Sequence, residues 1–232
     1  MLVARQECAG ASLNGRIYAF GWDKSCESFA PGETAWRQEA DCPVVLGGGN
    51  GMAGQFNVTT LDGTAYVAGP FGLLSFRPQH GWATLPGFGK PLGGCPLVAA
   101  HQKEVWVMSG FFYDPTPGQM CDLKREVHSY DPTTHQWRER PPLPCCEAWG
   151  AGASVGGTLY AIGGSKFSRD AKTFCFDNRV FVLEAGAPYK QGDCVVHTTG
   201  WRSAPAEIKP PAHDASTELR APSRIAAARS SA

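Results

Sequence analysis

The chain has 232 residues, and its 21 Lys and Arg balance 21 Asp and Glu, so the formal net charge is zero. A neutral chain has no global field to attract nucleic acid or an anionic membrane, and we expect neither as a partner. No apolar run approaches the roughly 18 residues that span a bilayer, and the N-terminus lacks the apolar core of a secretory signal. We therefore expect a cytoplasmic protein. Its 28 Gly and 18 Pro favour turns over long helices.

Four short segments share one pattern, in which an aromatic residue lies inside an apolar run that a glycine closes. The segments are 15–21, 63–69, 103–110 and 157–164, and their aromatic residues are Tyr18, Tyr66, Trp106 and Tyr160. Self-similarity with a period of some 40 to 50 residues is typical of repeat architectures.

The surroundings of each copy also repeat. A small-residue run precedes each one and ends in a turn, which is Asn14-Gly15, Asp62-Gly63 or Gly156-Gly157 in three of the four copies. Two-residue hairpins favour these dipeptides because both central residues need positive φ. A further apolar strand and a tryptophan follow, and these tryptophans are Trp36, Trp82, Trp137 and Trp201. Each unit therefore predicts four short antiparallel strands, and no segment has a convincing helical period.

These motifs resemble the kelch repeats of β-propellers, most specifically in segments 13–21, 129–144 and 155–164. The resemblance covers roughly residues 8–205 and implies an all-β fold with four-stranded blades around a central channel. We expect one domain at 1–205 with blades at about 8–42, 52–90, 94–144 and 148–205. The Pro-, Ala- and Ser-rich residues 206–232 are expected to be a disordered tail, or else the opening of another unit.

The number of blades departs from the family, whose propellers typically have six or seven. Only about four are recognisable here, so either four blades close, or the chain is a piece of a longer propeller, or a partner supplies the rest. An open stack exposes two large apolar faces, which would favour self-association.

The paired glycines of the fourth copy have two interpretations, a phosphate-binding loop or the end of a strand. The segment is one of four copies of a strand pattern, which favours the second interpretation. The other glycine-rich stretch, 47–51, is followed by no helical pattern, so it offers no helix N-terminus for a phosphate and is expected to link two blades. We expect Gly163-Gly164 to end the strand and to release the chain into a long loop. Tyr160 would pack between neighbouring blades, with Leu159 and Ile162 on opposite sides of a sheet covered on both faces.

Two long loops between second and third strands, at 111–125 and 165–178, are the candidate functional site. Insertions in repeat proteins gather on one face, which is often the binding face, and aromatic residues beside Arg or Lys are typical of protein-binding hot spots. The candidates are Phe112, Tyr113, Asp114, Arg125, Lys166, Phe167, Arg169 and Lys172. The alternative is that these are surface loops without a ligand.

The sequence thus favours a non-catalytic protein-interaction module with an unknown protein partner. The kelch resemblance implies adaptor roles, including substrate recognition for ubiquitin ligases. It also implies a rival, an enzyme of the sugar epimerase or oxidase class, and a truncated, non-functional fragment is a third possibility. Common catalytic motifs are absent and the six histidines have no ligand spacing, so we expect no catalytic residue, metal or cofactor. A catalytic interpretation would begin with Arg5, Glu7 or Glu147 facing the channel.

The nine cysteines contain no C-x-x-C pair and fit neither a zinc ribbon nor a small disulfide framework. We expect reduced, mostly buried thiols. The alternative is an exposed and reactive thiol, for which the candidates are Cys145 and Cys146 in a proline-rich turn and Cys121 and Cys175 in the long loops.

Overall fold

The computed structural model describes residues 1–5, 8–21, 23–46, 55–113, 121–145, 148–168, 173–184, 188–191, 194–197 and 200–203. All secondary structure in these ranges is β-strand, as the sequence predicts. They contain no helix, and hence none that could cross a membrane. The predicted tail at 206–232 lies outside the described residues, and the domain bounds stay a prediction.

Four sheets of four antiparallel strands correspond to the four predicted units. The first contains β1 (Ala9–Leu13), β2 (Arg16–Phe20), β3 (Cys26–Phe29) and β4 (Arg37–Gln38). The second contains β5 (Asn57–Leu61), β6 (Thr64–Gly69), β7 (Gly72–Arg77) and β8 (Gly81–Thr84). The third contains β9 (Leu97–His101), β10 (Glu104–Met108), β13 (Val127–Asp131) and β14 (Gln136–Arg140). The fourth contains β15 (Ala151–Val155), β16 (Thr158–Ser168), β17 (Thr173–Glu184) and β20 (Gly200–Ser203).

Two small hairpins interrupt this plan. One, β11 (Phe111–Tyr113) with β12 (Cys121–Leu123), is inserted between the second and third strands of the third sheet. The other, β18 (Pro188–Gln191) with β19 (Cys194–His197), precedes the last strand of the fourth.

The turns between the first two strands of each sheet confirm the predicted hairpins. Asn14-Gly15, Asp62-Gly63 and Gly156-Gly157 all have positive φ at both residues. The third sheet makes the same turn with Gln102 and Lys103, at φ of 49° and 63°, although neither residue is a glycine. The sequence marks this last turn only weakly, because positive φ is favoured by glycine and asparagine and neither residue is present here.

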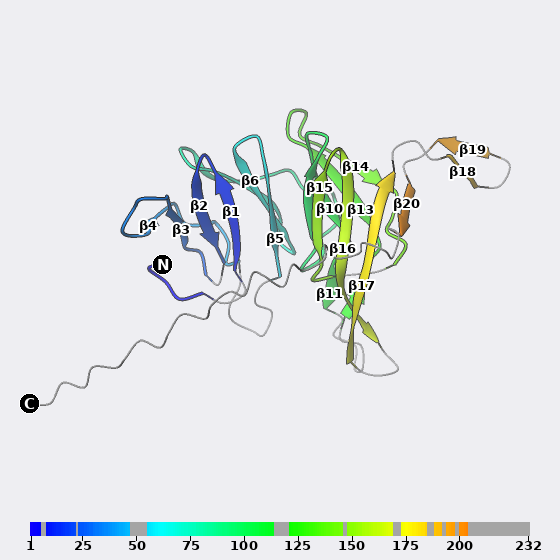
Figure 1. The fold of residues 1–232 in the computed structure, drawn as a ribbon, viewed down its shortest axis with the longest axis horizontal. Helices are drawn as coiled ribbons and strands as arrows, with labels where there is room; N and C mark the ends of the chain where they lie inside the picture. Colours follow the sequence, from blue (N-terminus) through cyan, green and yellow to red (C-terminus); the bar gives the residue numbers. More distant parts are fainter. Residues whose placement is uncertain are drawn as a thin grey trace, which may run out of the picture.

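The four sheets pack face to face in chain order (Figure 1). Their first strands, β1, β5, β9 and β15, lie innermost and contact one another in that order. Among the described strands, β15 has no comparable contact with β1, so the row of sheets is open between its two ends (Figure 1). We call the side of a sheet that meets the next sheet its forward face, and the opposite side its back face.

The recurring aromatic residue lies on the forward face. Tyr18, Tyr66 and Trp106 are buried, and each belongs to a cluster of buried residues shared with the following sheet. The aromatic residues of the first three units therefore pack between sheets. Packing between blades was expected of Tyr160, and there it is wrong: Tyr160 is only half-buried, because no described sheet follows the fourth.

The recurring tryptophan joins each sheet to the one before it. The indole nitrogens of Trp82, Trp137 and Trp201 donate to the carbonyl oxygens of Ala40, Pro86 and Pro141 at 2.8, 2.7 and 3.0 Å. Each acceptor lies just after the last strand of the preceding sheet. Trp36 of the first sheet contacts Phe29 at 5.5 Å between ring centroids, and no described residue accepts its N–H.

Two expectations about the fourth sheet are wrong. Gly163 and Gly164 do not end the strand: β16 continues through them to Ser168, with a β-bulge between Ile162 and Gly164. Positive φ at both glycines, 56° and 122°, lets the strand bend there while its pairing resumes beyond. The sheet is also covered on one face only, since Leu159 is fully buried while Ile162 is 39% exposed.

Candidate functional site

Two hairpins project from the same end of the third and fourth sheets (Figure 1). One is β11–β12, and the other is the part of β16–β17 beyond the bulge, from Gly164↔Asp177 to Ser168↔Thr173. They occupy the stretches expected to be long loops, so the loop assignment is corrected to strand hairpins. β12 lies against β16, which places the two projections side by side.

The links between sheets hold the bases of these hairpins. Gly94 pairs with Phe111, and Ala148 pairs with Ser165, in isolated β-bridges. The links also bond to each other, since the amide of Trp149 donates to Cys95 oxygen at 3.1 Å. The second-to-third-strand insertions therefore emerge on the same side as the links between sheets.

Aromatic side chains gather around this end of the molecule. Trp149, in a link, stacks on Phe111 with ring centroids 4.5 Å apart and an interplanar angle of 16°. Trp149 nevertheless remains 43% exposed, and Phe176 on β17 is 89% exposed. The ammonium of Lys124 lies 5.8 Å from the ring centroid of Phe112. Exposed rings next to a cation are the composition that protein-binding hot spots favour.

Only part of the predicted site residue set falls on described side chains. Phe112 is half-buried, and Arg125 is exposed at the base of the β11–β12 hairpin. Arg125 is also structural, because its Nε donates to Leu143 oxygen at 2.6 Å. The backbones of Tyr113, Lys166 and Phe167 lie in β11 and β16, but their side chains are outside the described structure, as are Asp114, Arg169 and Lys172.

Three residues at this end were not among the sequence-based candidates: Lys124, Trp149 and Phe176. Phe176 and Lys124 lie in the two insertions, and an aromatic-plus-basic criterion applied to every insertion residue would have selected them. Trp149 lies in a link, outside both insertions, so its position beside Phe111 depends on the tertiary packing alone.

The residues suggested as channel-facing have a structural role where they are described. Arg5 donates to Glu27 at 2.8 Å, and both side chains are fully buried. Arg5 also donates to the carbonyl oxygens of Gly21 and Ser25 at 2.7 and 3.0 Å. Burial opposes ionisation of Glu27, but hydrogen bonds from the amides of Leu2 and Val3 and from Arg5 outweigh it and lower its pKa. The pair thus anchors the N-terminal segment to the first sheet. Glu7 and Glu147 lie outside the described residues.

Among the cysteines whose side chains the structure describes, Cys26, Cys42 and Cys95 are buried. Burial raises the pKa of Cys26, and it raises that of Cys42 to about 11, so both stay protonated at neutral pH. Cys8 is exposed, whereas Cys145 and Cys175 are half-buried. Cys145 packs against the third–fourth sheet cluster and lies 3.1 Å from the Arg179 guanidinium, so it is less exposed than expected. Within the ranges that the structure covers, no three His, Cys, Asp or Glu side chains are grouped to hold a metal ion.

Comparisons with known proteins agree with this architecture. No protein-family model matches the chain. Beta-scruin of Limulus polyphemus, a kelch-repeat protein, is 23% identical over 190 residues, which is 72% of this chain and 20% of beta-scruin. The solved structure of YjhT matches with a TM-score of 0.62 at 16% identity, over 90% of this chain and 67% of that one. The chain folds as a kelch-repeat β-propeller.

The coverage of these matches differs. This kelch propeller chain spans about a fifth of the length of beta-scruin. Its four sheets align with about two thirds of the YjhT chain, in keeping with an open row of blades. At 16% identity the YjhT match indicates the fold alone.

Proposed function

We propose that this chain is a non-catalytic protein-interaction module of the adaptor type. The partner would bind at the projecting ends of β11–β12 and β16–β17, together with the link that carries Trp149. The observation that carries the proposal is the group of exposed or half-buried rings at this end, Phe112, Trp149 and Phe176, with Lys124 beside them. Blades packed on one another give such hairpins a rigid base, which lowers the entropic cost of binding.

The sequence-based candidates on these hairpins complete the proposed contact surface. They are Phe112, Tyr113, Asp114, Arg125, Lys166, Phe167, Arg169 and Lys172. Five of these eight are aromatic or basic residues whose side chains the structure does not describe. Their proposed contribution therefore rests on where the hairpins lie. We infer a partner whose surface is apolar with acidic groups at its rim, because the basic residues would then meet opposite charge.

The experiment is affinity capture with the whole chain as bait, read by quantitative mass spectrometry. Wild type is compared with Phe176→Ala, Tyr113→Ala and Arg169→Ala on the hairpins, and with Val155→Ala as the control. Val155 is 66% exposed at the opposite end of its sheet, in the strand that precedes the β15–β16 turn.

Partners captured by wild type and by the control, but reduced several-fold by the hairpin variants, would support the proposal. Equal capture by all four variants would overturn it, provided that each variant retains the wild-type unfolding midpoint. Because Phe176 is 89% exposed, its replacement leaves the core unchanged, so reduced capture would reflect the lost surface contact.

A further inference from the structure

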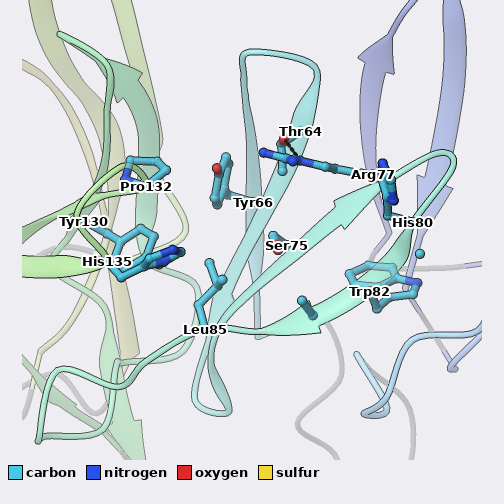
Figure 2. Close-up of a pocket in the computed structure, with 12 residues that line it drawn as sticks. Thr64, Tyr66, Ser75, Arg77, His80, Trp82, Leu85, Tyr130, Pro132 and His135 are labelled. Carbon is cyan, nitrogen blue, oxygen red and sulfur yellow. Dashed lines mark hydrogen bonds between the residues drawn. The ribbon is translucent and has the colours of Figure 1, made fainter.

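A cavity of about 330 Å³ lies between the second and third sheets, at the end opposite to the projecting hairpins. Figure 2 shows Tyr66 and Leu85 on one side of this cavity, facing Tyr130, Pro132 and His135 of the third sheet. Arg77 extends from β7 across β6 toward Thr64, to which its Nε donates at 2.8 Å. The volume is at the small end of the range for ligand sites, about 300 to 1,000 Å³.

The forward faces of the neighbouring sheets each carry an arginine near the same end, although on different strands. In the first sheet, Arg16 donates from Nη2 to Ser28 Oγ at 2.8 Å. It also forms a bidentate ion pair with the Glu33 carboxylate, at 2.8 and 2.9 Å. In the third sheet, Arg140 donates from Nε to Ser129 Oγ at 2.8 Å and from Nη2 to Glu104 at 2.5 Å. Each face thus contains a hydroxyl, an arginine and a carboxylate in contact.

The second sheet has the first two of these groups and lacks the third. Arg77 is held by the Thr64 hydroxyl, but no carboxylate pairs with it among the described residues. The strand register shows which charged groups of the neighbouring sheets have no counterpart here. Thr64 stands one residue after the β5–β6 turn, where the third sheet has Glu104 and the first sheet has Arg16. Ala83 pairs with Ser75, whereas the corresponding serines of the first and third sheets pair with Arg37 and Arg138.

Two positions that carry large charged side chains in the neighbouring sheets therefore carry Thr64 and Ala83 at the cavity, and no described carboxylate pairs with Arg77. Guanidinium groups bind carboxylates through two parallel hydrogen bonds, and these are among the strongest polar contacts in proteins. His135 adds a second polar group, since its Nδ1 lies 2.7 Å from the Tyr130 hydroxyl and its other ring nitrogen has no described partner. Leu85, Pro132 and Trp82 supply an apolar lining for the carbon chain of a ligand.

We propose that this cavity binds a carboxylate group, which pairs with Arg77 as Glu33 pairs with Arg16 and Glu104 with Arg140. The carboxylate is either that of a small organic acid or an acidic side chain of a polypeptide, since both present the same two oxygens. The site is separate from the hairpins, because the β5–β6 and β7–β8 turns lie at the other end of the strands. It does not depend on the proposed function.

The test is a titration of the whole chain, followed by NMR or calorimetry, with three probes. Succinate represents a free organic acid, a terminally blocked Ala-Glu-Ala peptide represents an acidic side chain, and the blocked Ala-Gln-Ala peptide is its uncharged match. We expect saturable binding of one or both acidic probes and at least about tenfold weaker binding of the glutamine peptide. The tighter of the two acidic probes assigns the source.

Three variants locate the binding. Arg77→Gln removes the guanidinium and is expected to weaken binding at least about tenfold. Thr64→Glu supplies the acid that the third sheet has at this position, so Arg77 is paired internally and the probe is excluded. Arg37→Gln is the control, because Arg37 is an exposed arginine of the first sheet, outside the cavity. Equal affinity for the glutamine peptide, no saturable binding, or unchanged affinity in Arg77→Gln would each overturn the proposal. Should Thr64→Glu fail to fold, Arg77→Gln alone still decides it, since Arg77 is exposed.

Discussion

The interfaces inside the row of blades differ from its two ends at equivalent positions. Two residues after the recurring aromatic, Phe20, Ala68 and Met108 are fully buried on forward faces, whereas Ile162 of the last blade is 39% exposed. One residue before it, Ala65, Val105 and Leu159 are fully buried on back faces, whereas Ile17 of the first blade is 49% exposed. The end blades therefore carry the same kind of surface as the inner ones and lack only a neighbour.

This difference indicates where the stability of the fold resides. A single kelch blade is covered on neither face, so apolar burial comes from pairs of blades rather than from each sheet alone. The N-terminal segment covers part of the back face of the first blade through Glu27.

The largest effect is expected from Phe76→Ala, at the interface of the first two blades. The Phe76 ring is fully buried and lies within 5.0 to 5.7 Å of the rings of Trp82, Tyr18 and Phe20. Its removal leaves a cavity and should lower the free energy of unfolding by about 3–5 kcal/mol. Ile162→Ala at the open end should cost about 1 kcal/mol or less. Urea titrations measure both values, and equal losses would contradict the contrast.

A second comparison uses one substitution at two equivalent positions. Trp137→Phe removes the donor of the 2.7 Å hydrogen bond to Pro86 oxygen and should lower the free energy of unfolding by about 1–2 kcal/mol. Trp36→Phe removes an indole N–H that has no described acceptor, so its effect should be several-fold smaller. The same urea titration measures both. A larger loss in Trp36→Phe would mean that the first blade has a neighbour at its back face.

Low pH should lower the free energy of unfolding through two buried histidines of the third sheet, which lies inside the row of blades. Burial lowers the pKa values of His101 and His128, and the nearby carboxylates of Glu104 and Glu126 offset this only partly. The unfolded chain then binds more protons than the folded one below the ordinary histidine pKa of about 6.5. Stability is fully present above that pH and is lost as the pH falls.

Unfolding midpoints at pH 7.5 and 5.5 measure this loss. His128→Gln should reduce it, because His128 packs against the ring of Phe88, 3.8 Å away between centroids, where a charge is poorly solvated. His80→Gln, at an exposed position, serves as the control and should leave the loss unchanged. A midpoint that is independent of pH would show that the buried imidazoles accept protons without cost.

The smallest effect on stability is expected from charges at the two ends. Ile17→Lys and Ile162→Lys should change the free energy of unfolding by about 0.5 kcal/mol or less, since both side chains are partly solvated. They should nonetheless reduce self-association, which we expect of wild type because the forward face of one chain matches the back face of another. Sedimentation over a range of concentrations tests this, and a wild type that stays monomeric throughout would contradict it.

The sequence predicted the features that depend on local patterns. The hairpin dipeptides, the interval between aromatic residues and the recurring tryptophans all gave correct strands, because turns and alternation are encoded within a few residues. The indole bonds to the preceding blade were missed, since an acceptor such as Pro86 lies 51 residues from its donor Trp137.

The candidate site was predicted less completely. The two insertions were correctly located, but Gly163-Gly164 was taken for a strand end because isolated glycines weaken strands, whereas here they form a bulge within a longer pairing. The exposure of Trp149 and Phe176 depends on the whole structure. The cavity beside Arg77 results from what Thr64 and Ala83 lack relative to neighbouring blades, which becomes visible only when the strand registers are compared.

The bulge at Gly163 has a consequence for how the length of the β16–β17 projection could change. Pairing beyond it, from Gly164↔Asp177 to Ser168↔Thr173, is independent of the register that packs Leu159 and Phe181 into the blade. Each rung of such a ladder adds about 3.3 Å of reach. Insertion or deletion of two rungs at a time keeps every remaining side chain on its own face. The packed part of the blade is thus a fixed base for a hairpin of variable length. Related chains could differ in the length of this hairpin while the cores of their blades stay the same.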